Sequence, residues 1–153
     1  MKQMLYIVWQ CTWGLPQTLL GLVVFLAHIG CQHFWYHGAV VTEWDSSFSA
    51  SFGLFIFVTP HPARDKRKEG RIPDFQMKQC LLVHEYGHTI QSLLFGPLYL
   101  VVMAIPSAAW GFLPYFRRKR ADGVPYSDFF TESLANRLGE WVTGERSMQG
   151  AVI

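Results

Sequence analysis

Residues 75–95 read FQMKQCLLVHEYGHTIQSLLF, and this stretch predicts the central element of the fold. Asp74 follows Pro73 and is a favourable N-cap, while Gly96-Pro97 stops or turns a helix at the other end. We therefore expect one helix over residues 75–95. The helix is apolar on almost every side. Its two histidines and its glutamate would be buried polar groups, which need partners.

A His-Glu-x-x-His pattern lies within this helix, at residues 84–88. Positions i and i+4 lie on one face of a helix, so the imidazoles of His84 and His88 can bind one metal ion. Zinc lowers the pKa of bound water toward 7, and Glu85 can accept its proton as a general base. Gly87 costs about 1 kcal/mol relative to alanine inside a helix, which indicates that another backbone or a substrate passes close by. The alternative is a pair of core histidines with ordinary hydrogen bonds.

A catalytic zinc ion needs a third protein ligand, and residues 127–142 offer one on a further helix. Within it, Glu132 shares a helix face with the small or short residues Ala135, Asn136 and Gly139. Such a face can approach the motif closely and present one carboxylate. Asn136, one turn later, can hydrogen-bond a ligating histidine. The alternative for Glu132 is a solvated carboxylate.

HExxH followed by E-x-x-A-[D/N] at residues 132–136 resembles the gluzincin metallopeptidases. It is most similar to their membrane-embedded branch, which includes the CAAX prenyl endopeptidase and the β-lactam-sensor peptidases. The resemblance covers residues 75–140. It implies that His84, His88 and Glu132 bind zinc and that Glu85 is the base. The whole chain also resembles small bacterial membrane proteins that carry HEYGH.

The chain departs from the gluzincin pattern in two ways. Asn136 stands where the family usually has aspartate. The residue that donates a hydrogen bond in the transition state is not fixed by a motif, and Tyr126 and Arg137 are the candidates for it.

The composition is typical of a chain in contact with lipid. Half of the 153 residues are apolar and 16% are charged, against roughly 25% charged residues in ordinary soluble domains. The length fits a single domain over residues 1–153. A net charge of +2 is too small to indicate nucleic-acid binding. Three widely spaced cysteines suggest neither a disulfide framework nor a cysteine zinc site.

Two stretches are long and apolar enough to cross a bilayer, which takes about 20 mainly apolar residues. They are residues 4–29 and 93–113, the second containing a helix expected over 97–113. A cleaved signal peptide is the alternative for the first, but its apolar run is long and has no clear cleavage site. We expect an integral, multi-pass protein of the cell membrane.

Residues 38–58 are rich in aromatic and β-branched residues, and turn residues divide them into two short runs. This pattern predicts a β-hairpin near the membrane surface. Its 47–58 strand offers an edge to an extended peptide. The expected fold is therefore α+β and mainly α: a helical membrane protein with a small β-hairpin or sheet before the HExxH helix and a helical hairpin after it.

Two basic clusters, at residues 64–71 and 117–120, bear on the topology. A hairpin at Gly96-Pro97 would place both clusters on one side of the membrane, in accord with the positive-inside rule, and would return Glu132 to the motif. A continuous span over 75–113 would separate them. We expect the hairpin, with the active site near the cytoplasmic face.

These patterns predict a zinc-dependent metallohydrolase that cuts a peptide or a membrane-protein substrate. The first alternative is a catalytically inactive relative with a binding or regulatory role, and the second is a structural membrane protein with a chance motif. Glu85 favours the enzyme, because holding a metal does not require it. We interpret His28, His33 and His37 as packing residues near the interface rather than as a second metal site.

Overall fold

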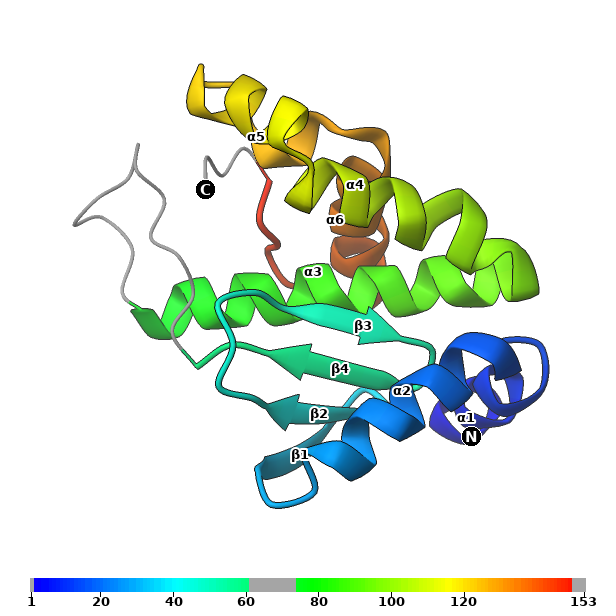
Figure 1. Ribbon diagram of the computed structural model, residues 1–153. Helices are drawn as coiled ribbons and strands as arrows, with labels where there is room; N and C mark the ends of the chain where they lie inside the picture. The colour runs from blue at the N-terminus through cyan, green and yellow to red at the C-terminus, as the bar shows by residue number, and fades with distance from the viewer. Residues whose placement is uncertain (1, 61–73, 150–153) are drawn as a thin grey trace.

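The computed structural model describes residues 2–60 and 74–149. The fold is α+β and mainly helical, as the sequence predicts (Figure 1). The basic cluster at 64–71 lies outside the described residues. The helices are α1 (Lys2–Thr12), α2 (Leu15–Ala27), α3 (Asp74–Phe95), α4 (Ile105–Phe112), α5 (Pro114–Ala121) and α6 (Phe130–Thr143), with shorter helical turns at η1 (Gly96–Leu98), η2 (Leu100–Ala104) and η3 (Tyr126–Asp128).

The β section is a four-stranded sheet in the order β1-β2-β4-β3. Its strands are β1 (Gln32–Tyr36), β2 (Ala39–Glu43), β3 (Ala50–Phe52) and β4 (Phe55–Val58). The pairing differs from the single hairpin expected over 38–58, because β2 and β4 are parallel and each belongs to its own hairpin.

Two glycines explain this difference in pairing. Gly38 has φ 95° and Gly53 has φ 58°, a region that glycine enters without steric cost. Each lies in a two-residue turn, His37-Gly38 between β1 and β2 and Gly53-Leu54 between β3 and β4. The sequence interpretation took Gly38 as the boundary of the β section, whereas it lies at the centre of a turn.

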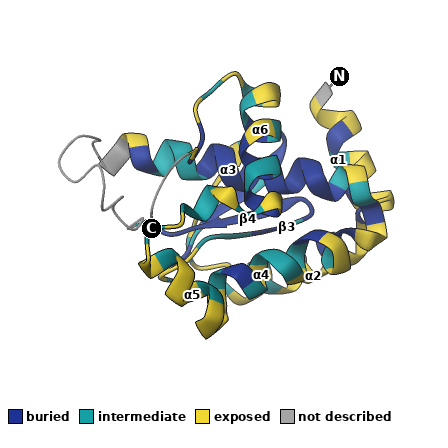
Figure 2. Cartoon of the chain, turned by 90° about the horizontal axis from the view of Figure 1, so that it is seen from above, coloured by how far each residue is buried: buried dark blue, intermediate teal, exposed yellow. Residues whose placement is uncertain are grey.

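Helices cover both faces of the sheet, and β4 is buried along its whole length. On one face Phe25 of α2 contacts Phe55, with ring centroids 5.3 Å apart. Successive strand residues alternate in direction, so Ile56 and Val58 point to the opposite face, which α3 covers (Figure 1). Figure 2 shows that α3 is buried through its middle, where it lies between the sheet and α6. The predicted central helix is therefore confirmed as a core element.

The apolar stretch 4–29 is not one helix. It forms α1 and α2, which meet at 98°. Gly14 lies between the two helices, and Pro16, in the first turn of α2, cannot donate the hydrogen bond that would continue α1. In the part of the chain that the structure describes, no single helix is both long and apolar enough to cross a membrane. Two bent helix pairs, residues 3–27 and 100–121, meet that test by length and composition when each pair is taken together.

Two buried glutamines fix this corner to α3. Gln10 donates to the main-chain oxygen of Thr89 at 2.9 Å, and Gln17 donates to Oγ of Ser92 at 2.8 Å. Both glutamines are completely buried. They are the two glutamines of the apolar 4–29 stretch, and they face protein because each finds a hydrogen-bond partner there.

The chain reverses after α3, as the expected helical hairpin requires (Figure 1). Gly96 has φ 52°, and a Cβ there would lie 2.3 Å from the Trp13 ring. The return arm consists of η1, η2 and α4, and α5 and η3 then lead to α6. The last helix begins at Phe130 rather than at 127, because Tyr126–Asp128 form a separate turn and Phe129 is extended.

Candidate metal centre

Helices α3 and α6 pack with their backbones in contact. A Cβ on Gly87 would lie 1.8 Å from the main-chain oxygen of Ala135, and a Cβ on Gly139 would lie 2.2 Å from that of Val83. Only glycine therefore fits at these two positions. This contact is the close backbone approach that Gly87 and the small face of the last helix predict, and it brings Glu132 to the HExxH motif.

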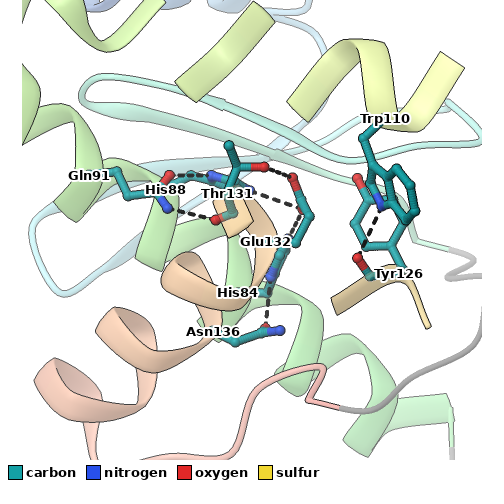
Figure 3. Close-up of polar contacts among 8 residues, drawn as sticks. All are labelled: His84, His88, Gln91, Trp110, Tyr126, Thr131, Glu132 and Asn136. Atoms are coloured by element: carbon teal, nitrogen blue, oxygen red, sulfur yellow. Dashed lines mark hydrogen bonds and ion pairs between the residues drawn. The ribbon is translucent and has the colours of Figure 1, made fainter. Parts of the chain in front are cut away.

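Three side chains from these helices converge on one point (Figure 3). Oε2 of Glu132 lies 3.1 Å from Nε2 of His84 and 3.4 Å from Nε2 of His88. One ligand atom from each residue lies within 4.8 Å of the other two, and all three residues are buried. Among residues 2–60 and 74–149, no other group of three or more His, Cys, Asp or Glu side chains converges in this way.

A hydrogen-bond chain fixes the orientation of the His88 ring. Nε2 of Gln91 donates to the main-chain oxygen of Thr131 at 2.7 Å. The amide oxygen of Gln91 must therefore face His88, whose Nδ1 lies 2.8 Å from it. An amide oxygen only accepts, so Nδ1 of His88 carries the hydrogen and its Nε2 is directed at Glu132.

His84 is oriented in the same way from the other helix. Its Nδ1 lies 2.8 Å from Oδ1 of Asn136, which is buried on α6 one turn after Glu132. The sequence predicts this contact for Asn136. Both imidazoles thus present Nε2 toward the carboxylate, and their other nitrogens are held by amide oxygens, an arrangement that fixes metal-ligating histidines.

The three converging atoms fit a metal cation. Two neutral imidazole Nε2 atoms and a carboxylate oxygen are all hydrogen-bond acceptors, and they would repel one another without a positive charge between them. Among the described residues, the buried Oε2 of Glu132 has no hydrogen-bond donor apart from the two imidazoles that face it. Its other oxygen accepts a hydrogen bond from Oγ1 of Thr131 at 2.9 Å. The group can therefore hold a metal ion.

The pKa values of Glu132 and His88 depend on each other's charge. Burial raises the pKa of Glu132, but the charge of His88 and hydrogen bonds from both histidines hold it well below its ordinary value. Burial lowers the pKa of His88, but the charge and hydrogen bond of Glu132 outweigh burial and raise it to about 9. Without metal, a proton on His88 supplies the positive charge that faces Glu132.

Glu85 lies beside the three converging residues and lines the same cleft. Burial raises the pKa of its carboxyl, and the charges of His84 and His88 partly offset that shift. The candidate base is thus buried and next to the metal position without belonging to the ligand group.

Tyr126 and Arg137, the two candidates for the transition-state donor, lie in different surroundings. The Tyr126 ring centroid is 6.4 Å from that of His84, and Trp110 donates to the main-chain oxygen of Tyr126 at 3.0 Å (Figure 3). Burial and the negative charges of Glu132 and Glu85 raise the pKa of Tyr126 well above its ordinary value, so its hydroxyl keeps its proton. Arg137 is exposed on α6 and does not line the cleft, so the structure does not bring it to the site.

The centre lies at the bottom of a cleft of about 630 Å³. One wall is the edge strand β3 with the segment before it, and the opposite wall is formed by η2, α4 and α5. Residues that the sequence interpretation did not connect to the site are Arg117, Arg120, Tyr99 and Ser51, which line the cleft, and Gln91, which holds His88. Gln91 could have been found from its position three residues after His88 on an apolar helix.

The other described histidines have packing roles, as interpreted from the sequence. Nδ1 of His28 lies 2.9 Å from the main-chain oxygen of Val24, and Nδ1 of His33 lies 3.0 Å from Oγ1 of Thr42. The ring of His37 packs edge-on against Tyr36.

No family model, no curated protein and no solved structure matches the chain in the comparisons with known proteins.

Proposed function

We propose that the protein is a zinc-dependent peptidase of the cell membrane. The observation that carries this proposal is the convergence of two imidazole nitrogens and one carboxylate oxygen, with Glu85 beside them in a cleft. Two histidines and one carboxylate are the ligands of many hydrolytic zinc centres, which keep one further position open. A purely structural metal site would need neither the open cleft nor Glu85.

Zinc suits this donor set because it binds both imidazole and carboxylate and needs no fixed d-electron geometry. When bound, it supplies Lewis acidity toward a carbonyl oxygen and lowers the pKa of a water molecule. His84, His88 and Glu132 would hold it. Asn136 and Gln91 would keep the two imidazoles in position and in the required tautomer.

The chain's own residues supply the remaining chemistry. Glu85 accepts the proton of the attacking water and passes it to the leaving amine, and its raised pKa suits a group that must bind and release a proton. The hydroxyl of Tyr126 donates to the substrate oxygen on which negative charge develops. Trp110 positions Tyr126 through its hydrogen bond to the main chain.

The edge of β3 supports a peptide substrate. In the part of the chain that the structure describes, this strand pairs only with β4, and residues 47–52 line the cleft along its free side. An extended peptide can add to such an edge by main-chain hydrogen bonds. It would then run past the metal position between β3 and the α4–α5 wall, and a peptide from a membrane protein would reach the site in this extended form.

Exposed apolar side chains support a location in the lipid bilayer. Val23 of α2 is 65% exposed, Val101 of η2 is 64% exposed and Ile105 of α4 is 62% exposed. Soluble proteins rarely expose so many large apolar residues on neighbouring elements. Two bent helix pairs embedded in one membrane, with the active site near the cytoplasmic face, would cover these residues.

The experiment uses Glu85→Gln, with protein purified in detergent and loaded with zinc. The variant keeps size and hydrogen bonding but removes the base, so it should keep about one zinc per chain and lose activity on a pool of synthetic peptides by on the order of 10² or more. His88→Ala is the control that should lose the metal as well. Wild-type activity in Glu85→Gln would exclude the proposed hydrolysis and favour a binding or regulatory role.

A further inference from the structure

The end of the cleft formed by α4 and α5 carries positive charge that no part of the proposed chemistry uses. Among the described residues, the charged side chains that line the cleft are Glu85, Glu132, Arg117 and Arg120. The two glutamates lie at the metal position and balance the charge of a zinc ion. The two arginines have no carboxylate within ion-pair distance in the described part of the chain. The cleft therefore has a surplus of positive charge at one end.

Arg120 is held in place but has an unused donor. Its Nη2 donates to the main-chain oxygen of Gly111 at 2.6 Å. Its guanidinium carbon lies 5.9 Å from the centroid of the Trp110 ring and 5.4 Å from that of the Tyr126 ring. Its Nε is buried and has no hydrogen-bond partner among the described residues. The guanidinium is thus oriented, lines the cleft and has no counter-charge among the described residues, which suits it to bind a carboxylate.

We propose that Arg120, assisted by Arg117, binds a carboxylate of the peptide substrate, so that the enzyme prefers substrates with an acidic group close to the cleaved bond. This inference rests on the proposed peptidase function and names its substrate class. The carboxylate is either the C-terminal α-carboxylate or an Asp or Glu side chain.

The geometry limits how far this carboxylate lies from the cleaved bond. The Tyr126 ring centroid is 5.4 Å from the Arg120 guanidinium and 6.4 Å from the His84 ring. Arg120 is therefore at most about 12 Å from the metal-binding histidine. An extended chain advances about 3.3–3.6 Å per residue, so the acidic group lies within roughly three residues of the cleaved bond.

The first test compares peptides in pairs on the wild-type, zinc-loaded protein in detergent. A synthetic pool contains each sequence with a free and with an amidated C-terminus, and with Asp or Asn and Glu or Gln at each internal position. Cleavage is followed by mass spectrometry. We expect on the order of tenfold faster cleavage, as kcat/KM, when a carboxylate lies within three residues of the cut. The C-terminal and internal pairs distinguish the two sources of the carboxylate.

Arg120→Gln should remove this preference, and Arg117→Gln should reduce it. Arg118→Gln is the matched control, because Arg118 lies on the same helix with the same charge but does not line the cleft. It should keep the full preference. Cleavage without any charge preference, or a preference that persists in Arg120→Gln, would overturn the inference while leaving the peptidase function intact.

A binding measurement separates this inference from the peptidase function. The zinc-loaded Glu85→Gln protein is titrated with suberic acid monohydroxamate and with the primary amide of the same molecule, whose hydroxamate groups bind zinc equally. We expect the free acid to bind on the order of tenfold more tightly, and Arg120→Gln in the same background to abolish the difference. Equal binding of both probes overturns the inference. A preference for the acid supports it even if no peptide is cleaved.

Discussion

The two helical neighbours of α3 are attached to it by opposite means. Toward α6, the backbones touch at Gly87 and Gly139, and Asn136 and Gln91 hold the imidazoles of His84 and His88 through hydrogen bonds. Toward α1 and α2, two buried glutamines make the polar contacts, while the outer faces of these helices expose large apolar side chains. On the α6 side, here called the metal side, all three candidate metal ligands come from the chain itself. On the apolar side, the outer faces of α1 and α2 form an exposed apolar surface, which supports the proposed contact with lipid.

The largest expected effect breaks the metal side at the helix crossing. Gly87→Ala places a Cβ 1.8 Å from the main-chain oxygen of Ala135, and a backbone atom cannot move away as a flexible side chain can. We expect a loss of about 3 kcal/mol or more in the free energy of unfolding, as in severe overpacking, together with loss of the zinc site. Thermal unfolding in detergent and metal content measure both effects.

Gly30→Ala is the control for this substitution. A Cβ on Gly30 meets no atom within 4 Å, so that variant should keep its stability and its zinc. If Gly87→Ala unfolds at the wild-type temperature and still binds zinc, α6 does not cross α3 as described.

The sequence predicted more of the metal side of α3 than of its apolar side. The HExxH spacing places both imidazoles on one helix face by local geometry alone. The small residues around Glu132 then identify the helix that can approach them. Gln91 and Arg120 were not predicted, because their roles depend on contacts with distant parts of the chain. Gln91 meets the Thr131 main chain, and Arg120 lies on a helix whose basic residues resemble a membrane flank.

On the apolar side, hydropathy identified the segments but not their shape. A window of apolar residues over 4–29 has the same mean hydropathy whether the helix is straight or bent. The bend of 98° follows from Gly14 and Pro16, and from buried partners for Gln10 and Gln17 that lie beyond residue 88. The sheet pairing was missed for a related reason, because the parallel contact between β2 and β4 joins strands from different hairpins.

A second prediction tests whether the apolar side contacts lipid. Val23→Glu combined with Leu26→Glu places two charges on the outer face of α2, where the native side chains are 65% and 55% exposed. We expect at least about tenfold weaker partitioning into liposomes, because charged residues are disfavoured in the bilayer. Flotation of reconstituted protein measures this. Zinc content should not change, since neither residue approaches the metal centre.

Trp141→Glu provides the comparison for that result. Trp141 is 80% exposed on α6, outside the apolar side, so its substitution should leave partitioning unchanged. Equal partitioning of wild type and the α2 double variant would mean that α2 does not face lipid.

A third prediction concerns the residue that orients His88. Gln91→Ala removes the acceptor for Nδ1 of His88 and leaves the Thr131 main-chain oxygen without its donor. We expect zinc affinity to fall about 10–100-fold, the usual cost of losing a partner behind a metal ligand. Competition with a coloured zinc chelator gives the affinity. Gln79→Ala, at a partly exposed position in the first half of α3 that does not line the cleft, should leave it unchanged.

A further prediction for the metal side is that zinc binding depends on pH. In the metal-free protein Glu132 raises the pKa of His88 to about 9, above the ordinary value of about 6.5. His88 is therefore protonated at pH 7, and zinc must displace that proton. Below pH 9 the apparent zinc affinity should fall about tenfold per pH unit because of this one proton. Titration calorimetry in two buffers with different ionisation enthalpies should show about one proton released per zinc at pH 7.

The same proton on His88 should stabilise the metal-free protein at low pH, and this stabilisation should be lost as the pH rises. A group whose pKa is higher in the folded than in the unfolded chain stabilises the fold fully below its unfolded value, here about 6.5. That contribution is lost as pH rises through about 9. The unfolding temperature of the metal-free protein should therefore fall between pH 6.5 and 9, whereas zinc-loaded protein, in which His88 carries no proton, should not show this fall. His88→Gln, which has no proton to lose in this range, should abolish the fall in the metal-free protein. A parallel fall in wild type and His88→Gln would mean that another group controls the stability of this side of α3.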